Sequence, residues 1–113
     1  MAEVIDYAKE DIHYVLGDTF DISFSVKKNG VNYAMTGMSL NFVAYTMNIA
    51  KTVIASASSA LGTILITSNV FNINLPALTV EEGKQYLYNI YLTNTEGVFT
   101  IQKGSIITEE GKK

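Results

Sequence analysis

The residues of this sequence that could do chemistry are few, and their spacing does not match a known catalytic arrangement. His13 is the only histidine and there is no cysteine, which excludes thiol nucleophiles and cysteine-ligated metals. A hydrolytic serine needs a base and an orienting acid, and His13, which lies near Asp11, is the only candidate base. No nucleophile-elbow motif accompanies the serines. We therefore predict that His13 has a structural or surface role and that the chain is not an enzyme.

The carboxylates do not indicate a site either. Asp18 and Asp21 could suggest calcium, but the loop of alternating carboxylates that an EF-hand requires is absent. The pairs Glu81-Glu82 and Glu109-Glu110 are adjacent in sequence, so their side chains diverge, and we expect them to be solvated. The eight glycines are scattered and form no phosphate-binding loop. The sequence thus predicts no catalytic residues, no metal site and no cofactor.

The charge of the chain argues against nucleic acid as a partner. The net charge is −3, the pI is about 5.0, and all eight basic residues are lysine, so no guanidinium group is present to read bases or clamp phosphates. Residues 29–80 contain only one charged side chain, Lys51. Two interpretations of this stretch remain open: a β-sandwich of low charge, or a docking face from which charge is excluded.

A membrane partner is not expected. The uncharged stretch Thr52–Val80 is interrupted by serine, threonine and asparagine residues and by Pro76, so it does not fit a membrane-spanning helix. Residues 1–11 are acidic and are not followed by the apolar region of a secretory signal.

β-Strands are the elements expected to position these residues. Apolar residues alternate with polar ones over 19–27, which predicts a half-buried strand, and Asn29-Gly30 supplies a hairpin turn. Further strands are expected over 31–35, 38–45, 62–67, 70–75, 85–93, 98–103 and 105–108. We predict an all-β chain, an immunoglobulin-like antiparallel β-sandwich of about 7–9 strands. The sandwich would span residues 12–108, between an N-terminal arm (1–11) and a solvated tail (109–113).

Three segments are less regular. Residues 46–60 fit either a mobile loop or an edge strand, and residues 78–83 fit one short helical turn that ends at Gly83. Gly104 is expected to mark a bulge or break between two strands.

The turn before Tyr86 contains acidic residues and a glycine, and a second aromatic residue, Tyr88, follows two positions later. This order resembles the tyrosine corner of immunoglobulin-like domains, in which the tyrosine hydroxyl bonds back to the preceding loop and the residue two positions on lies in the core. The alternative is a strand that is simply rich in tyrosine.

A candidate interaction patch follows from the same strand pattern. If Tyr86 and Tyr88 face the core, alternate residues of that strand face outward, and the strand over 38–45 would be its neighbour in one sheet. The exposed apolar and aromatic residues would then gather on one face: Val43, Tyr45, Leu87, Tyr91 and Val98. The alternative is that an extra strand or residues 46–60 cover this sheet.

Four motifs occur in order over about residues 12–108: Gly17-Asp18-Thr19-Phe20, Thr36-Gly37-Met38-Ser39-Leu40, the segment from Leu78 through Tyr86-Leu87-Tyr88, and Gly104-Ser105-Ile106-Ile107. Together they resemble the small immunoglobulin-like domains of tailed-phage virion proteins, in particular the N-terminal domain of phage baseplate upper proteins and related fibre anchors. Baseplate upper proteins continue into a stalk, whereas this sequence ends after the sandwich, which fits a capsid decoration protein, a head-fibre base or a small tail adaptor better.

The resemblance implies a non-enzymatic structural component of a virion that is assembled in the host bacterial cytoplasm. It implies contacts with other virion proteins (capsid, fibre or baseplate subunits) and a homo-oligomer in the particle. A carbohydrate-binding adhesion module for host cell-surface glycans is the alternative. Tyr45, Tyr91, Asn41 and Asn89 could together supply the aromatic faces and hydrogen-bonding groups that a sugar platform needs.

Overall fold

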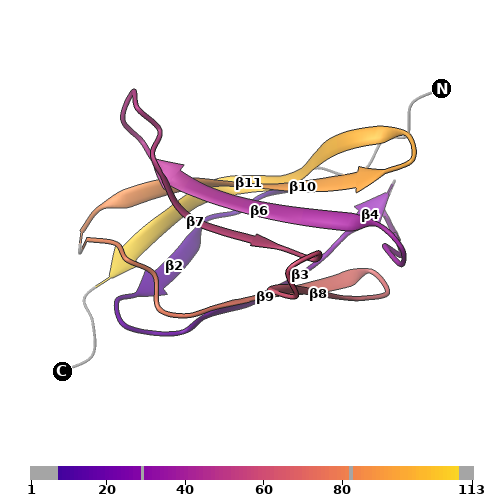
Figure 1. The fold of residues 1–113 in the computed structure, drawn as a ribbon, viewed down its shortest axis with the longest axis horizontal. Helices are drawn as coiled ribbons and strands as arrows, with labels where there is room; N and C mark the ends of the chain where they lie inside the picture. Colours follow the sequence, from indigo (N-terminus) through magenta and orange to yellow (C-terminus); the bar gives the residue numbers. More distant parts are fainter. Residues whose placement is uncertain (1–7, 29, 82, 110–113) are drawn as a thin grey trace.

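Two β-sheets lie face to face in the structure, and no helix occurs in the residues that it describes (Figure 1). This computed structural model describes residues 8–28, 30–81 and 83–109. Its strands are β1 (Ala8–Lys9), β2 (Ile12–Val15), β3 (Phe20–Ser25), β4 (Lys27–Lys28), β5 (Val31–Asn32), β6 (Ser39–Thr46), β7 (Val53–Ser58), β8 (Ile64–Thr67), β9 (Val70–Leu75), β10 (Gln85–Asn94) and β11 (Gly97–Glu109). Eight of these strands have four residues or more, so the prediction of an immunoglobulin-like β-sandwich with about 7–9 strands is confirmed.

The larger sheet contains six strands. Its order is β1-β11-β10-β6-β7, and β2 also pairs with β11. The smaller sheet has the order β3-β9-β8, and β4 and β5 form a separate hairpin. Most pairs are antiparallel, as predicted, but β1 and β2 run parallel to β11.

The core lies between the two sheets and contains the alternate apolar residues of the long strands. Four aromatic rings form a continuous row across it, with centroids 5.5 to 6.0 Å apart: Tyr14, Phe20, Phe42 and Tyr88. Phe20 belongs to the smaller sheet and Phe42 to the larger one, so this row joins the two layers. The remaining fully buried large side chains are Phe71, Met35, Leu40, Ile64, Ile73, Ile90, Leu92 and Ile106.

The predicted boundaries of the arm and the tail need correction. Ala8 and Lys9 pair with Gln102 and Lys103 of β11, and Glu109 is still part of β11, opposite Val15. β1 and β2 supply backbone hydrogen bonds to a strand edge that would otherwise be open, so they belong to the sheet. Residues 1–7 and 110–113 of the predicted arm and tail lie outside the described residues.

Local details also differ from the sequence prediction. The strand expected over 19–27 is divided at Val26. This residue is buried, and its backbone N–H donates to the carbonyl of Asn69 in the β8–β9 turn. Asn29 of the predicted turn lies outside the described residues, and β4 and β5 pair on either side of it. The expected helical turn over 78–83 is wrong: Lys84 donates to the carbonyl of Glu81 in a single tight turn. Glu82 lies outside the described residues.

The bulge lies at Ile101 and not at Gly104. The register between β10 and β11 shifts between Ile90 and Tyr91, which leaves Ile101 without a partner, and both Ile101 and Gln102 are buried. Gly104 lies within the continuous strand β11, where the backbone of Glu10 fills the space that a Cβ atom at residue 104 would need.

Candidate functional site

The five predicted patch residues lie on one side of the larger sheet, which we call the outer face. β6 and β10 are neighbours, as the patch hypothesis requires, and Tyr45 lies directly opposite Leu87. Val43 and Tyr91 lie opposite Asn89 and Asn41, so amide side chains alternate with the apolar ones. Val98 of β11 lies at the far end of this face beside Thr93, and it is 65% exposed. The other four residues are half-buried.

Residues 46–60 do not form a lid over the outer face. Val53–Ser58 form β7, which extends the sheet beside β6 as its edge strand, and Tyr45 pairs with Val53. Lys51 places its ammonium group 5.4 Å from the centroid of the Tyr45 ring. In the part of the chain that the structure describes, no further strand lies on the outer side of this sheet.

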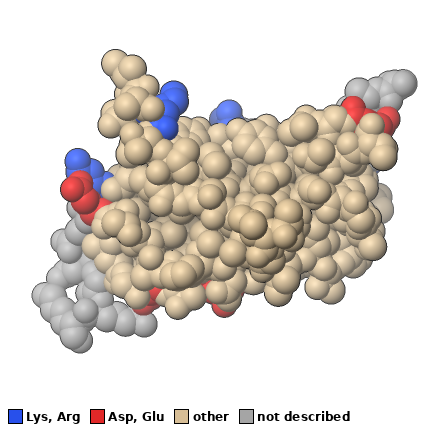
Figure 2. Space-filling model, viewed as in Figure 1, with Lys and Arg blue, Asp and Glu red and all other residues tan. Residues whose placement is uncertain are grey.

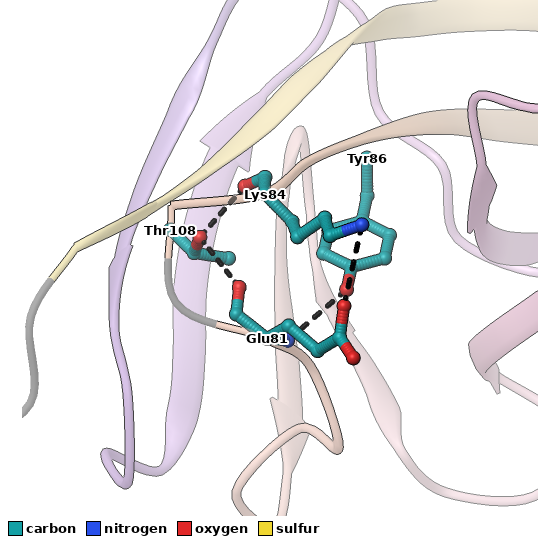
Figure 3. Close-up of polar contacts among 4 residues, drawn as sticks. All are labelled: Glu81, Lys84, Tyr86 and Thr108. Atoms are coloured by element: carbon teal, nitrogen blue, oxygen red, sulfur yellow. Dashed lines mark hydrogen bonds and ion pairs between the residues drawn. The ribbon is translucent and has the colours of Figure 1, made fainter.

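Tyr86 forms the hydrogen bond that characterises a tyrosine corner. Its hydroxyl accepts from the backbone N–H of Glu81 at 3.0 Å, and its ring is buried (Figure 3). The Thr108 hydroxyl lies 2.9 Å from the carbonyl oxygen of Glu81 and 2.6 Å from that of Lys84 (Figure 3). Tyr88, two positions after Tyr86, is 1% exposed and lies in the core row. This arrangement is structural and fixes where β10 begins.

A groove of about 660 Å³ opens on the outer face, where the chain crosses from β1 to β2. We call it the crossover groove. Tyr45, Leu87 and Asn89 line it from the sheet, and the Asn89 amide donates to the Tyr45 hydroxyl at 2.9 Å. Charged residues of both signs also line it, among them Lys9, Glu10, Asp11 and Lys103. Its volume falls within the range of small-ligand sites.

The wall of the crossover groove is held by a buried hydrogen-bond network. Gln102 donates its side-chain N–H to the Tyr88 hydroxyl at 3.0 Å, and Tyr88 donates in turn to the backbone carbonyl of Glu10. Asp11 accepts from the backbone N–H of Ser105 at 3.2 Å. These bonds fix the crossover against β10 and β11.

The connection between β6 and β7 is a second surface feature that the sequence pattern did not identify. This segment, residues 46–53, forms a hairpin that projects from the body of the sandwich (Figure 1). Met47 is 54%, Ile49 101% and Val53 56% exposed. The available sequence signal was a pair of large apolar residues, Met47 and Ile49, directly after a strand in a stretch without charge until Lys51.

A smaller groove of about 190 Å³ lies along the edge strand β7, and we call it the edge groove. Six of its lining residues are apolar: Ile54, Ala55, Leu75, Pro76, Ala77 and Leu78. The backbone N–H of Leu78 donates to the Tyr14 hydroxyl at 2.9 Å, which holds this wall in place. In the view of Figure 2 the charged side chains lie at the margin of the molecule, and the centre of the face is uncharged.

The residues weighed as catalytic or metal candidates do not come together. The Nδ1 atom of His13 lies 3.4 Å from Oε2 of Glu109, and both side chains are at least half exposed. The Asp21 carboxylate accepts from the Asn72 side chain at 2.7 Å, and Asp11 belongs to the network described above. Among the described residues no three histidine, aspartate or glutamate side chains are grouped so that they could hold a metal ion. Glu82 and Glu110 lie outside the described residues. No described helix is long and apolar enough to span a membrane.

Comparisons with known proteins bear on the fold alone. No model of a protein family matches the sequence, and no curated protein matches it. The fold is similar to the crystal structure of CopC from Methylosinus trichosporium OB3b, with a TM-score of 0.52 over 91% of this chain and 87% of that one. The two sequences are 7% identical, so the likeness concerns the arrangement of strands.

Proposed function

We propose that this chain is a non-enzymatic structural component of a tailed-phage virion. In this role it is an immunoglobulin-like protein–protein interaction module, either a capsid decoration protein, a head-fibre base or a tail-baseplate adaptor. Its partners are other virion proteins (capsid, fibre or baseplate subunits), and it forms a homo-oligomer in the particle. The proposal rests on the sequence resemblance and on one structural observation. This observation is the band of apolar and aromatic side chains on the outer face, formed by Val43, Tyr45, Leu87 and Tyr91.

The composition of the outer face supports contact with another protein. Contiguous apolar patches on a soluble domain are uncommon, and aromatic residues are enriched at the centres of interfaces. Tyr45, Leu87 and Tyr91 are half-buried and stand on a rigid sheet, so a partner would immobilise few flexible side chains. The amides of Asn41 and Asn89 add hydrogen-bonding groups within the band.

The experiment follows incorporation into particles. We expect mass spectrometry of density-purified phage particles from the encoding genome to detect this chain. The double variant Tyr45→Ser, Tyr91→Ser should be incorporated at least tenfold less. The matched control is Leu65→Ser, which removes a 61% exposed apolar side chain from the smaller sheet and should be incorporated normally. Absence of the chain from particles would refute the virion role. Normal incorporation of the double variant would remove the outer face as the interface.

Carbohydrate binding is a second candidate, and the crossover groove favours it. The groove combines the Tyr45 ring, the Asn89 amide and charged groups of both signs, which together could bind the apolar and hydroxyl faces of a sugar. A glycan array tests this candidate. A glycan that binds the wild type, and binds Asn89→Ala at least tenfold more weakly, would support it, whereas an array without binding would reject it.

A further inference from the structure

The β6–β7 hairpin presents apolar side chains to solvent on a fixed backbone. Ile49 is fully exposed at its tip, and Met47 is 54% exposed. Hydrogen bonds hold the loop. The backbone N–H of Thr46 donates to the Thr52 carbonyl at 2.9 Å, and that of Thr52 donates to the Thr46 hydroxyl at 2.9 Å. Asn48 accepts from the backbone N–H of Lys51 with both its carbonyl and its side-chain oxygen, at 3.1 Å each. A partner would therefore meet a pre-organised apolar projection.

The edge groove has the complementary character. Ile54 and Ala55 form one of its walls, and Pro76, Ala77 and Leu78 lie on the other. The remaining lining side chains beyond Leu75 are Ser56 and Thr79, so no charged group lines it. The hairpin rises above β6 while residues 76–79 run below β7, so the two features face different directions on one molecule (Figure 1). One copy therefore offers an apolar projection in one place and an apolar recess in another.

Charge favours a second copy of this chain as the occupant of the groove. The whole chain carries a net charge of −3, so two copies repel each other unless they meet through uncharged surfaces. Both surfaces come from residues 29–80, where the single charged side chain, Lys51, lies against the Tyr45 ring. A charged partner would find no complementary group in the groove.

We propose that Ile49 of one copy inserts into the edge groove of the next. The contact joins two different surfaces, so it is head-to-tail. In a joined pair, the copy whose Ile49 is inserted keeps its own groove free, and the other copy keeps its hairpin free. Such a contact generates a ring if the rotation between copies closes, and otherwise a filament. The inference concerns other residues than those of the outer face, and it does not depend on a role in a virion.

The test uses two single variants and their mixture. Ile49→Asp places a carboxylate at the exposed tip, and Ala77→Glu places one in the groove on an exposed residue, so both variants should fold. Light scattering after size-exclusion chromatography, over micromolar to millimolar concentrations, should show wild-type species larger than a dimer. Each variant alone should be monomeric. An equimolar mixture should form a 1:1 dimer, because the intact groove of one variant accepts the intact hairpin of the other.

A matched control separates this contact from general stickiness. Leu61→Asp changes another exposed apolar residue (80% exposed) that belongs to neither surface, and it should assemble as the wild type does. A wild type that is monomeric at every concentration would overturn the inference. The inference would also be overturned if the two single variants failed to form a dimer when mixed. It would be overturned as well if Leu61→Asp lost assembly to the same extent as Ile49→Asp and Ala77→Glu. Tyr91→Ser alone changes the outer face opposite Asn41, away from the hairpin, and should assemble normally here, so loss of the outer-face contact and loss of the hairpin–groove contact can be told apart.

Discussion

The Tyr86 hydroxyl lies 3.0 Å from the backbone nitrogen of Glu81, five residues upstream, and accepts its hydrogen bond. Thr108 of β11 holds the carbonyl of the same residue at 2.9 Å. Two strands of the larger sheet thus fix one peptide segment of the connection that arrives from β9 in the smaller sheet. This connection also carries Pro76, Ala77 and Leu78, so the anchoring at Glu81 helps to set the wall of the edge groove.

Replacing Tyr86 by phenylalanine should lower the free energy of unfolding by about 1 kcal/mol, because one partly buried hydrogen bond is lost while the ring stays in place. Urea denaturation should show a lower midpoint with an unchanged m-value. The control is Tyr91→Phe, since the Tyr91 hydroxyl makes no hydrogen bond within the described residues, and its midpoint should not move. Equal effects of the two substitutions would show that the Glu81 bond contributes nothing.

The pair Tyr88 and Gln102 should behave as one unit. Tyr88→Phe removes the hydroxyl that accepts from the Gln102 amide. Because Gln102 is 3% exposed, its amide would be left buried without this partner, so we expect the free energy of unfolding to fall by about 1–3 kcal/mol. Adding Gln102→Leu to Tyr88→Phe should cost less than Gln102→Leu alone, with a coupling of about 0.5–3 kcal/mol in a double-mutant cycle. Ser23 lies in the other sheet, so a cycle of Tyr88→Phe with Ser23→Ala should be additive. Additivity in both cycles would contradict the network.

Alternating apolar residues were sufficient to predict β6, β9 and β10 and their buried faces. Leu40, Phe42 and Ala44 of β6 are buried, as are the alternate residues of β9 and β10 that the pattern assigns to the core. The outer-face residues follow from the same parity, since opposite faces of a strand alternate. A turn signal of acidic residues and glycine before Tyr86 placed the tyrosine corner, because that motif is local in sequence.

Features that depend on contacts distant in sequence could not be predicted. Gly104 resembles a strand break in the sequence, but it is explained only by Glu10, which crosses it. The crossover groove unites residues 9–11 with residues near 45, 88 and 104, and the edge groove unites residues near 55 with residues 75–79. The alternation of apolar and polar residues within one strand does not show which distant residues line the same groove. Parallel pairing of β1 and β2 with β11 likewise depends on which edge is left open by the other strands.

Substitution of Gly104 by alanine should displace the crossover between β1 and β2. A Cβ atom at residue 104 would collide with the backbone of Glu10, so we expect the free energy of unfolding to fall by about 1–3 kcal/mol. The Glu10 amide, which donates to the Lys103 carbonyl at 3.1 Å, should also exchange its hydrogen faster.

Gly62→Ala is the matched control for this effect. Gly62 has a φ of +80° and no atom near its Cβ position, so alanine there should destabilise the protein through the backbone alone. Exchange at Glu10 should then stay at the wild-type rate. Unchanged exchange in Gly104→Ala would show that the crossover is not held by close contact at this glycine.

The turn between β8 and β9 should gain stability from a glycine. Ser68 is the first residue of this two-residue turn and has a φ of +57°, a left-handed conformation that costs an L-residue about 1–2 kcal/mol. Glycine removes that strain but loses about 0.5–1 kcal/mol of chain entropy on folding. Ser68→Gly should therefore raise the free energy of unfolding by about 0.5–1 kcal/mol and Tm by roughly 2–6 °C. The Ser68 carbonyl still accepts from Met35 at 2.8 Å, since that bond uses only the backbone. Ser56→Gly in β7 has no such strain to relieve and should lower Tm, so a fall in Tm for both variants would refute this account of the turn.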